Sequence, residues 1–245
     1  MSDTPGCYIQ GRGLVSALGL DLPAALACLA AGGVSPVPTL VAPDARAPLF
    51  RIPETTPDWY ARARLLVRKA VAECGPGVDR RAPLFLASSS LDVGALEDGA
   101  PYQPDCQAFV EQVGAWLDWQ GPVFWVSTAC TSSLNAILAA LRRIRSGTGS
   151  EALVLGMEVF NRFSSAGFGA MQLLDPESPR PLAAERAGLV LGEAVAALHL
   201  GSTPARWRIR GGANLIDGSN PAGATRSAIT RMAGQALADS GLAPA

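Results

Sequence analysis

The chain has 245 residues, 49% hydrophobic and 17% charged, a composition typical of a folded globular protein and unlike that of a disordered chain. Its formal net charge of -1 excludes a global positive field that would hold nucleic acid or an anionic membrane. The N-terminus lacks the pattern of a signal peptide, and every apolar run is shorter than the roughly 20 residues that span a bilayer, so we expect a cytoplasmic protein.

The cysteines are odd in number and show no CxxC spacing. Such a set predicts neither a disulfide framework nor a zinc site. We therefore expect free thiols and a chain without a metal or a cofactor. The five cysteines are Cys7, Cys28, Cys74, Cys106 and Cys130.

Segments of strand and helix character alternate along the chain. The proline-rich residues 33–57 are expected to form a surface loop. The alternation predicts an α/β layered architecture with helices on both faces of a mixed sheet. In chain order we expect strand 7–13, helices 22–31 and 59–74, strand 83–88, helix 106–119, strand 123–126, helix 131–146, strand 152–159, helix 163–174, strands 194–200 and 206–212, and helix 224–241.

The helix expected over residues 131–146 is the best defined of these. Aliphatic residues recur at helical spacing along it, and alanines leave little bulk on its other faces. We therefore expect it to be central and packed on several sides. The arginines near its C-terminal end, which complement the helix dipole and are expected to be solvated, are Arg142, Arg143 and Arg145.

Cys130 lies between the strand expected at 123–126 and this helix, in the segment "VSTACTSSLNA". Free N–H groups at a helix N-terminus and the positive end of its dipole favour a thiolate over a thiol. A strand-to-helix turn also places the side chain at the carboxyl end of the strand, where ligands of open α/β sheets bind. From its position alone, Cys130 is either a nucleophile or a small residue that fills a crowded turn.

Three blocks of sequence, in the right order, resemble one family. "STACTSSLNA" around Cys130 resembles the nucleophile motif of β-ketoacyl-acyl carrier protein synthases, whose usual form is close to "DTACSSSL". Residues 166–200 resemble that family's stretch leading through "RPFD" and "RDGFV" to "GEGAG", and residues 9–19 resemble its opening "VTGLGVVSPLG" strand. The resemblance implies the thiolase-like fold, layered α/β/α/β/α in two similar halves, of which residues 1–245 would form the nucleophile-bearing N-terminal half.

The resemblance also implies roles for single residues. Cys130 would accept an acyl group from a carrier-protein thioester, and its own backbone N–H would donate a hydrogen bond to the oxyanion. A carbanion formed by decarboxylation of malonyl carrier protein would then attack the acyl group and lengthen the acyl chain. Phe168, in "GFG", would lie beside the acyl pocket. Glu193 would be a structural acid beneath the site. No cofactor is implied.

Several positions depart from the family's pattern. "RDGFV" is "RAGLV" here, with Ala187 for the acid, and "GEGAG" is "GEAVA". The family's "HGTGT" histidine, its second histidine and its lysine belong to the second half and have no counterpart here, so we expect that half to be absent from this chain. His199 matches an apolar family position, which predicts a core or edge role. Asp175, Glu177 and Arg180 are expected to form a solvated turn.

Three functions remain open at this point. The leading hypothesis is the N-terminal half of a synthase in fatty acid, polyketide or aryl-polyene synthesis, and the runner-up is a non-catalytic partner like the chain-length-factor subunits. A simple binding module for acyl carrier protein is the third. The resemblance implies a homodimer, or a heterodimer with a synthase subunit, because the family's strand before the nucleophile, here residues 123–126, lies at a two-fold interface.

Overall fold

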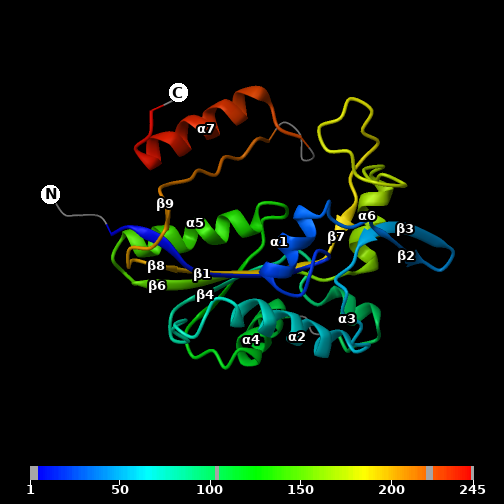
Figure 1. Cartoon of the computed structure of the whole chain (residues 1–245), viewed down its shortest axis with the longest axis horizontal. Coiled ribbons are helices and arrows are strands. Elements are labelled where there is room, and N and C mark those ends of the chain that lie inside the picture. The colour runs from blue at the N-terminus through cyan, green and yellow to red at the C-terminus, as the bar shows by residue number, and fades with distance from the viewer. Residues whose placement is uncertain (1–4, 103–104, 219–222, 244–245) are drawn as a thin grey trace.

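A six-stranded mixed sheet forms the centre of the computed structural model, which describes residues 5–102, 105–218 and 223–243 (Figure 1). The first three strands in sheet order are mutually parallel, and the other three join them by antiparallel pairing. In sheet order the strands are β5 (Val123–Val126), β4 (Leu84–Ala87), β6 (Glu151–Glu158), β8 (Ala194–Gly201), β1 (Cys7–Ser16) and β9 (Trp207–Ile209).

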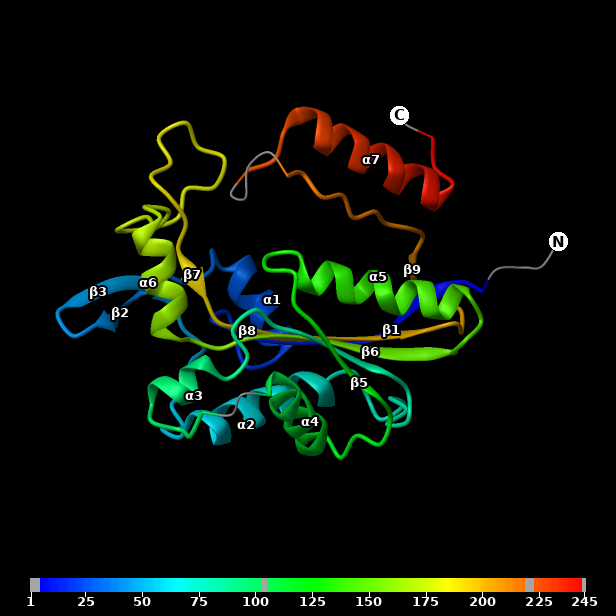
Figure 2. The ribbon, with the colours of Figure 1, turned by 180° about the vertical axis from the view of Figure 1, so that it is seen from behind.

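The central strands are apolar on both sides because helices cover both faces of the sheet. All four residues of β4 are buried, and their side chains alternate between two hydrophobic clusters. On one face Leu84 and Leu86 pack against α2 (Trp59–Ala72) and α4 (Cys106–Trp116). On the other face Phe85 and Ala87 pack in a cluster with residues of α5 (Ser132–Arg145). Figures 1 and 2 show α5 on the opposite face of the sheet from α2 and α4.

The smaller elements lie at the edge where the parallel strands end. A second sheet contains β2 (Val37–Ala42), β3 (Ala45–Phe50) and β7 (Leu191–Gly192). The expectation of a loop across residues 33–57 is therefore wrong, because these residues contain the β2–β3 hairpin. Its prolines are tolerated since the hairpin is mostly exposed and β2 is an edge strand. Three short helices complete the chain up to β8: α1 (Leu22–Ala30), α3 (Val93–Glu97) and α6 (Arg162–Ala170).

The last helix, α7 (Arg226–Ser240), lies beyond α5 on the far side from the sheet (Figure 2). It is attached near its C-terminal end, where Asp239 accepts hydrogen bonds from Arg145 at 3.1 and 3.0 Å and from the Gly212 N–H at 3.0 Å. Arg145 is therefore paired, contrary to the solvated role expected for it. The expectation that α5 is packed on several sides is met only in part, because Leu134 on its outer face is 65% exposed.

The predicted α/β layered architecture is confirmed. Each predicted helix and strand is present within a few residues of its expected bounds, and the strand predicted at 123–126 coincides with β5. The elements that the sequence did not predict are the hairpin, β7 and α3. None of the helices in the described part of the chain combines the length and hydrophobicity that crossing a bilayer requires.

Candidate active site

Cys130 is exposed in the turn that joins β5 to α5. The neighbouring parallel strands β4 and β6 end at the same edge of the sheet, so the residues that follow all three strands lie close together. A cavity of about 500 Å³ opens there, and its wall includes Ser89 after β4, Cys130 after β5 and Asn161 after β6. The predicted position of Cys130 at the carboxyl end of a strand is confirmed.

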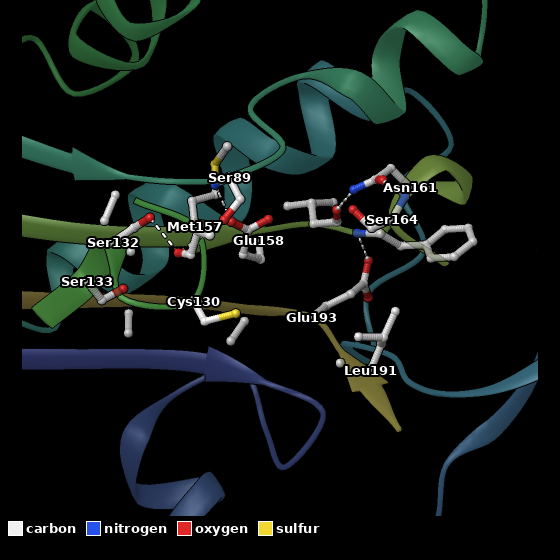
Figure 3. A pocket seen from close by; sticks show the side chains of 18 of the residues that line it. Ser89, Cys130, Ser132, Ser133, Met157, Glu158, Asn161, Ser164, Leu191 and Glu193 are labelled. Carbon is white, nitrogen blue, oxygen red and sulfur yellow. Dashed lines mark hydrogen bonds between the residues drawn. The ribbon is translucent and has the colours of Figure 1, made fainter. Parts of the chain in front are cut away.

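The three site residues expected from the resemblance share this cavity. Figure 3 shows the Cys130 sulfur pointing into it, and Glu193 and Phe168 are also part of its wall. Phe168 belongs to α6 and is half-buried. The structure thus brings together Cys130, Phe168 and Glu193 from three separate parts of the sequence.

The turn before α5 has an unusual backbone conformation at Ala129, whose φ is 52°. A residue with a Cβ in this left-handed region costs about 1 kcal/mol or more, so surrounding contacts must hold it there. The Ala129 carbonyl accepts hydrogen bonds from the Ser132 N–H at 3.1 Å and the Ser132 Oγ at 2.7 Å. These bonds fix the peptide immediately before Cys130.

Thr128, one residue earlier, is bonded through three of its atoms. Its N–H donates to Ser132 Oγ at 2.9 Å, and its carbonyl accepts from Thr131 Oγ1 at 2.8 Å. Its own hydroxyl accepts from Asn135 Nδ2 at 2.7 Å. The first turn of α5 therefore holds the backbone on the N-terminal side of Cys130 through side-chain hydrogen bonds.

Glu193 forms the centre of a buried ion cluster in the cavity wall. Arg62 donates to both of its carboxylate oxygens, at 2.8 and 2.9 Å, and Arg51 donates at 3.2 Å. The backbone N–H groups of Ile52 and Phe160 add bonds of 2.8 and 2.9 Å. Burial raises the pKa of Glu193, but the hydrogen bonds from Arg62 and the Phe160 N–H, together with the charges of Arg62 and Arg51, hold the pKa below its usual value.

This cluster joins the residue between β7 and β8 to α2, to the segment after β3 and to the segment after β6. A carboxylate that accepts five hydrogen bonds is held ionised and has little capacity left to move a proton. The geometry therefore favours a structural role for Glu193, which is the role expected from the sequence.

A second carboxylate in the cavity wall, Glu158 at the end of β6, was missed by the sequence analysis. It accepts hydrogen bonds from the Ser89 N–H at 2.5 Å and from Ser90 Oγ at 2.6 Å, and so holds the loop after β4. Figure 3 shows Glu158 beside Ser89. Ser89 Oγ in turn donates to the Ala129 carbonyl at 3.4 Å. The run of three serines at the end of a predicted strand, residues 88–90, was a signal that could have identified this loop.

Two other expectations concern residues outside the cavity wall. His199 is buried and bonded to Glu151 at 2.9 Å, which confirms a core or edge role. It lies five residues along β8 from Ala194, about 17 Å from the cavity end of that strand. Asp175 is buried, so the expected solvated turn is wrong at this residue; its Oδ1 accepts the N–H groups of Glu177 and Ser178.

Hydrogen bonds to the carboxylate set the charge state of Asp175. The backbone N–H of Glu177 is the main cause that lowers its pKa, although burial acts in the opposite direction.

Within residues 5–102, 105–218 and 223–243, no cluster of three or more His, Cys, Asp or Glu side chains has the arrangement of a metal site.

Comparison with known proteins relates this site to a family. Residues 107–204, which include β5, the Cys130 turn, α5 and all of β8, match the model of the β-ketoacyl synthase N-terminal domain. This chain contains a ketosynthase-like N-terminal domain. The match confirms the inferred resemblance and contains two of the three sequence blocks, the one around Cys130 and residues 166–200.

Curated relatives of the ketosynthase-like domain match over short stretches. Nodulation protein E of Rhizobium sp. (strain N33) is 39% identical over 83 residues, which are 34% of this chain and 21% of that protein. Polyketide synthase ThaG of Burkholderia thailandensis is 33% identical over 132 residues, covering 49% of this chain and 2% of that protein. The alignment thus spans about a fifth of nodulation protein E and far less of the large synthase.

Solved structures confirm the thiolase-like ketosynthase fold across the chain. The ketosynthase ApeO in complex with its chain length factor ApeC, from Xenorhabdus doucetiae, superposes with a TM-score of 0.82 at 23% identity, covering 100% of this chain and 70% of that one. The ishigamide ketosynthase/chain length factor gives a TM-score of 0.78 at 22% identity, covering 98% and 71%. A third neighbour is a type II acyl-carrier protein in complex with its ketosynthase, with a TM-score of 0.74 at 17% identity, covering 99% and 71%.

Proposed function

We propose that Cys130 accepts an acyl group from the thioester of an acyl carrier protein, the first half of a β-ketoacyl synthase reaction. The observation that carries this proposal is the exposed Cys130 thiol in the wall of a 500 Å³ cavity. Apolar side chains such as Leu49, Phe168 and Leu191 line much of that cavity, which suits a bound acyl chain.

The proposed transfer balances as a thioester exchange. The Cys130 thiolate attacks the thioester carbon, a new C–S bond forms, and the bond to the carrier's sulfur breaks. The carrier leaves as a thiolate that takes a proton from water. The Cys130 N–H is the proposed donor to the oxyanion that forms during attack.

Condensation with malonyl carrier protein requires further groups. Decarboxylation leaves an enolate that needs polarising donors, and His199, the only histidine in the 245 residues, is buried, bonded to Glu151 and distant from the cavity. We assign these groups to polypeptide outside residues 1–245 or to a partner subunit. The described residues then act as the acyl-accepting domain of a two-part site.

The test is to incubate the purified chain with acyl carrier protein and to measure its intact mass. We expect a mass increase equal to the acyl group, absent in Cys130→Ala and present in Cys106→Ala. With malonyl carrier protein added, no β-ketoacyl product should form, because loss of one positioned proton-transfer or polarising group typically costs about 10² to 10⁴ in rate. Elongation that depends on Cys130 would show that residues 1–245 suffice for the complete reaction.

The second candidate function is a non-catalytic partner that pairs with an active synthase, as a chain length factor does. The departures at Ala187 and in "GEAVA" favour it, and two structural neighbours are ketosynthases with their chain length factors. Retention of Cys130 favours the acyl-accepting function. The mass measurement separates the two, since a non-catalytic partner remains unacylated.

Either function includes a partner subunit at the β5 edge. β5 ends the sheet, and Phe124 and Trp125 on it are 46% and 38% exposed. An exposed apolar edge strand of this kind favours pairing with a second chain. We expect sedimentation to show a dimer at micromolar concentration, with Trp125→Lys shifting it to monomer; a soluble monomer of the unmodified chain would contradict this pairing.

A further inference from the structure

We infer that Ser132 is the positioning residue of the Cys130 turn: its buried hydroxyl holds the two peptides that precede the thiol and so directs Cys130 into the cavity. The inference deepens the proposed function, because orientation of the thiol matters only if Cys130 attacks a bound thioester. It names a residue of the cavity wall whose hydroxyl is bonded to backbone atoms and which acts on the thiol through the backbone.

Ser132 is placed differently from the other hydroxyls around Cys130. It is the first residue of α5 and only 4% exposed, whereas Thr128, Thr131 and Ser133 are all exposed. A buried hydroxyl without partners would be costly, and this one has two. It accepts from the Thr128 N–H at 2.9 Å and donates to the Ala129 carbonyl at 2.7 Å.

These two bonds bracket the strained residue. Ala129, at φ 52°, lies between the peptide groups that Ser132 holds, and Cys130 follows directly. If the Ser132 hydroxyl is removed, the Thr128 N–H loses its side-chain acceptor and the Ala129 carbonyl keeps the Ser132 N–H and the longer bond from Ser89. The left-handed conformation is then less well enforced, and the direction of the Cys130 side chain is no longer fixed.

Ser133 provides a matched comparison. It is the next residue along α5 and also lies in the cavity wall, but its hydroxyl makes no hydrogen bond within the described part of the chain. Removing the Ser133 hydroxyl therefore deletes the same atom from the same helical turn without releasing the peptides before Cys130. A general effect of mutating the start of α5 would appear in both variants.

The first measurement is amide hydrogen exchange at Thr128 in the full chain, since this N–H donates directly to Ser132 Oγ. We expect exchange at least about 10-fold faster in Ser132→Ala than in the unmodified chain, and unchanged within about 3-fold in Ser133→Ala. Equal exchange at Thr128 in both variants would overturn the inference. If Ser132→Ala does not fold, Ser132→Thr, which keeps the hydroxyl, must fold and retain protection at Thr128; its failure to do so also overturns the inference.

The second measurement compares two reactions of Cys130 in Ser132→Ala. Acyl transfer from a carrier-protein thioester needs the correct direction of attack and should slow by about 10- to 100-fold, whereas alkylation by the small reagent iodoacetamide should change by less than about 3-fold. Equal slowing of both reactions would show loss of structure and contradict a positioning role. If the unmodified chain is not acylated at all, the proposed function fails, while the exchange measurement still decides the role of Ser132.

Discussion

The cysteines of the chain differ sharply in their surroundings. Burial raises the pKa of Cys7 and of Cys74 to about 11, so both remain thiols near neutral pH. Cys106 and Cys130 are exposed. Reactivity toward alkylating reagents follows thiolate content and access, so the two exposed residues are the candidates for modification.

We expect Cys130 to be alkylated first, ahead of Cys106. Both precede or begin a helix, but at Cys106 the free N–H groups of the helix already have an acceptor, since the Asp105 carboxylate accepts the Gln107 N–H at 2.9 Å. Peptide mass mapping after brief iodoacetamide treatment near neutral pH measures the order. Preferential labelling of Cys106, with Cys130 unmodified, would favour a filler role for Cys130.

The Glu193–Arg62 pair supports a prediction about stability. Glu193→Gln removes the main counter-charge of the buried Arg62 and leaves it only Glu54, at 3.4 Å; breaking a buried ion pair on one side typically costs about 3–5 kcal/mol of unfolding free energy. The single variant Arg62→Met should also lower the unfolding free energy. The double variant Arg62→Met with Glu193→Gln should lose less unfolding free energy than the two single variants together, because it leaves no buried charge of this pair unpaired. Urea unfolding measures all three.

A partly exposed pair serves as the control for this cycle. Asp239 is paired with Arg145 at the surface, and Asp239→Asn should cost less than about 1 kcal/mol. Two results would show that the buried cluster does not stabilise the fold as described. One is additive losses of unfolding free energy in the Arg62 and Glu193 variants, and the other is a loss in Glu193→Gln no larger than in Asp239→Asn.

The site residues were predictable to different degrees. Cys130, Phe168 and Glu193 were identified because three sequence blocks resemble a known family, and the cavity contains all three. Ser132 and Glu158 could not be identified from the sequence, because their importance depends on hydrogen bonds to backbone atoms. Such partners become visible only when β4, β5 and β6 are aligned side by side.

At the scale of elements, replacing alanine by glycine should have opposite effects on stability in the turn between β5 and α5 and inside α5 itself. Ala129→Gly should stabilise the chain by a few tenths to about 1 kcal/mol, because glycine adopts a φ of 52° without steric cost. Ala139→Gly, inside α5, should instead destabilise it by about 1 kcal/mol. Ala129→Val should cost about 1–3 kcal/mol, since a branched side chain is poorly tolerated there.

Thermal or urea unfolding of the three variants is the measurement. Opposite signs for glycine at Ala129 and at Ala139 are the expected result. The same sign at both positions would mean that the left-handed turn is not maintained in solution.

The elements themselves were predictable where hydrophobic periodicity was strong. α5 and β5 were found within one residue of their ends, since both present clear apolar patterns. The β2–β3 hairpin was missed because prolines at 36, 38, 43 and 48 conceal its alternation and indicate a loop instead. Its strand character depends on mutual pairing and on β7, which lies about 140 residues away in the sequence.

At the scale of the whole molecule, several carboxylates link stability to pH. Burial raises the pKa of Glu193, but Arg62, Arg51 and the Phe160 N–H together lower it below its usual value. The backbone N–H of Gly212 is the main cause that lowers the pKa of Asp239. A carboxylate with a lowered pKa in the folded state stabilises the fold above its unfolded value, 4.5 for Glu and 3.8 for Asp. That contribution is lost as the pH falls through the folded-state pKa.

We therefore expect the unfolding free energy to decrease as the pH is lowered from about 5.5 to about 3.5. Urea unfolding at several pH values measures this decrease. Glu193→Gln, which is less stable where Glu193 is ionised, should show a shallower decline because it lacks one of the linked groups. If the unfolding free energy changes with pH equally in the variant and the unmodified chain, the pKa of Glu193 is the same in the folded and unfolded states, and the expectation is wrong.

The pairing of β1 with β8 has a consequence for biosynthesis. Ser16 lies opposite Ala194, so the two strands meet only after about 180 further residues have left the ribosome. At a translation rate of 5–20 residues per second, β1 remains without this partner for roughly 10 to 40 s. Meanwhile β4, β5 and β6 can assemble beneath α5, so the nucleophile turn is formed before the sheet that supports it is complete.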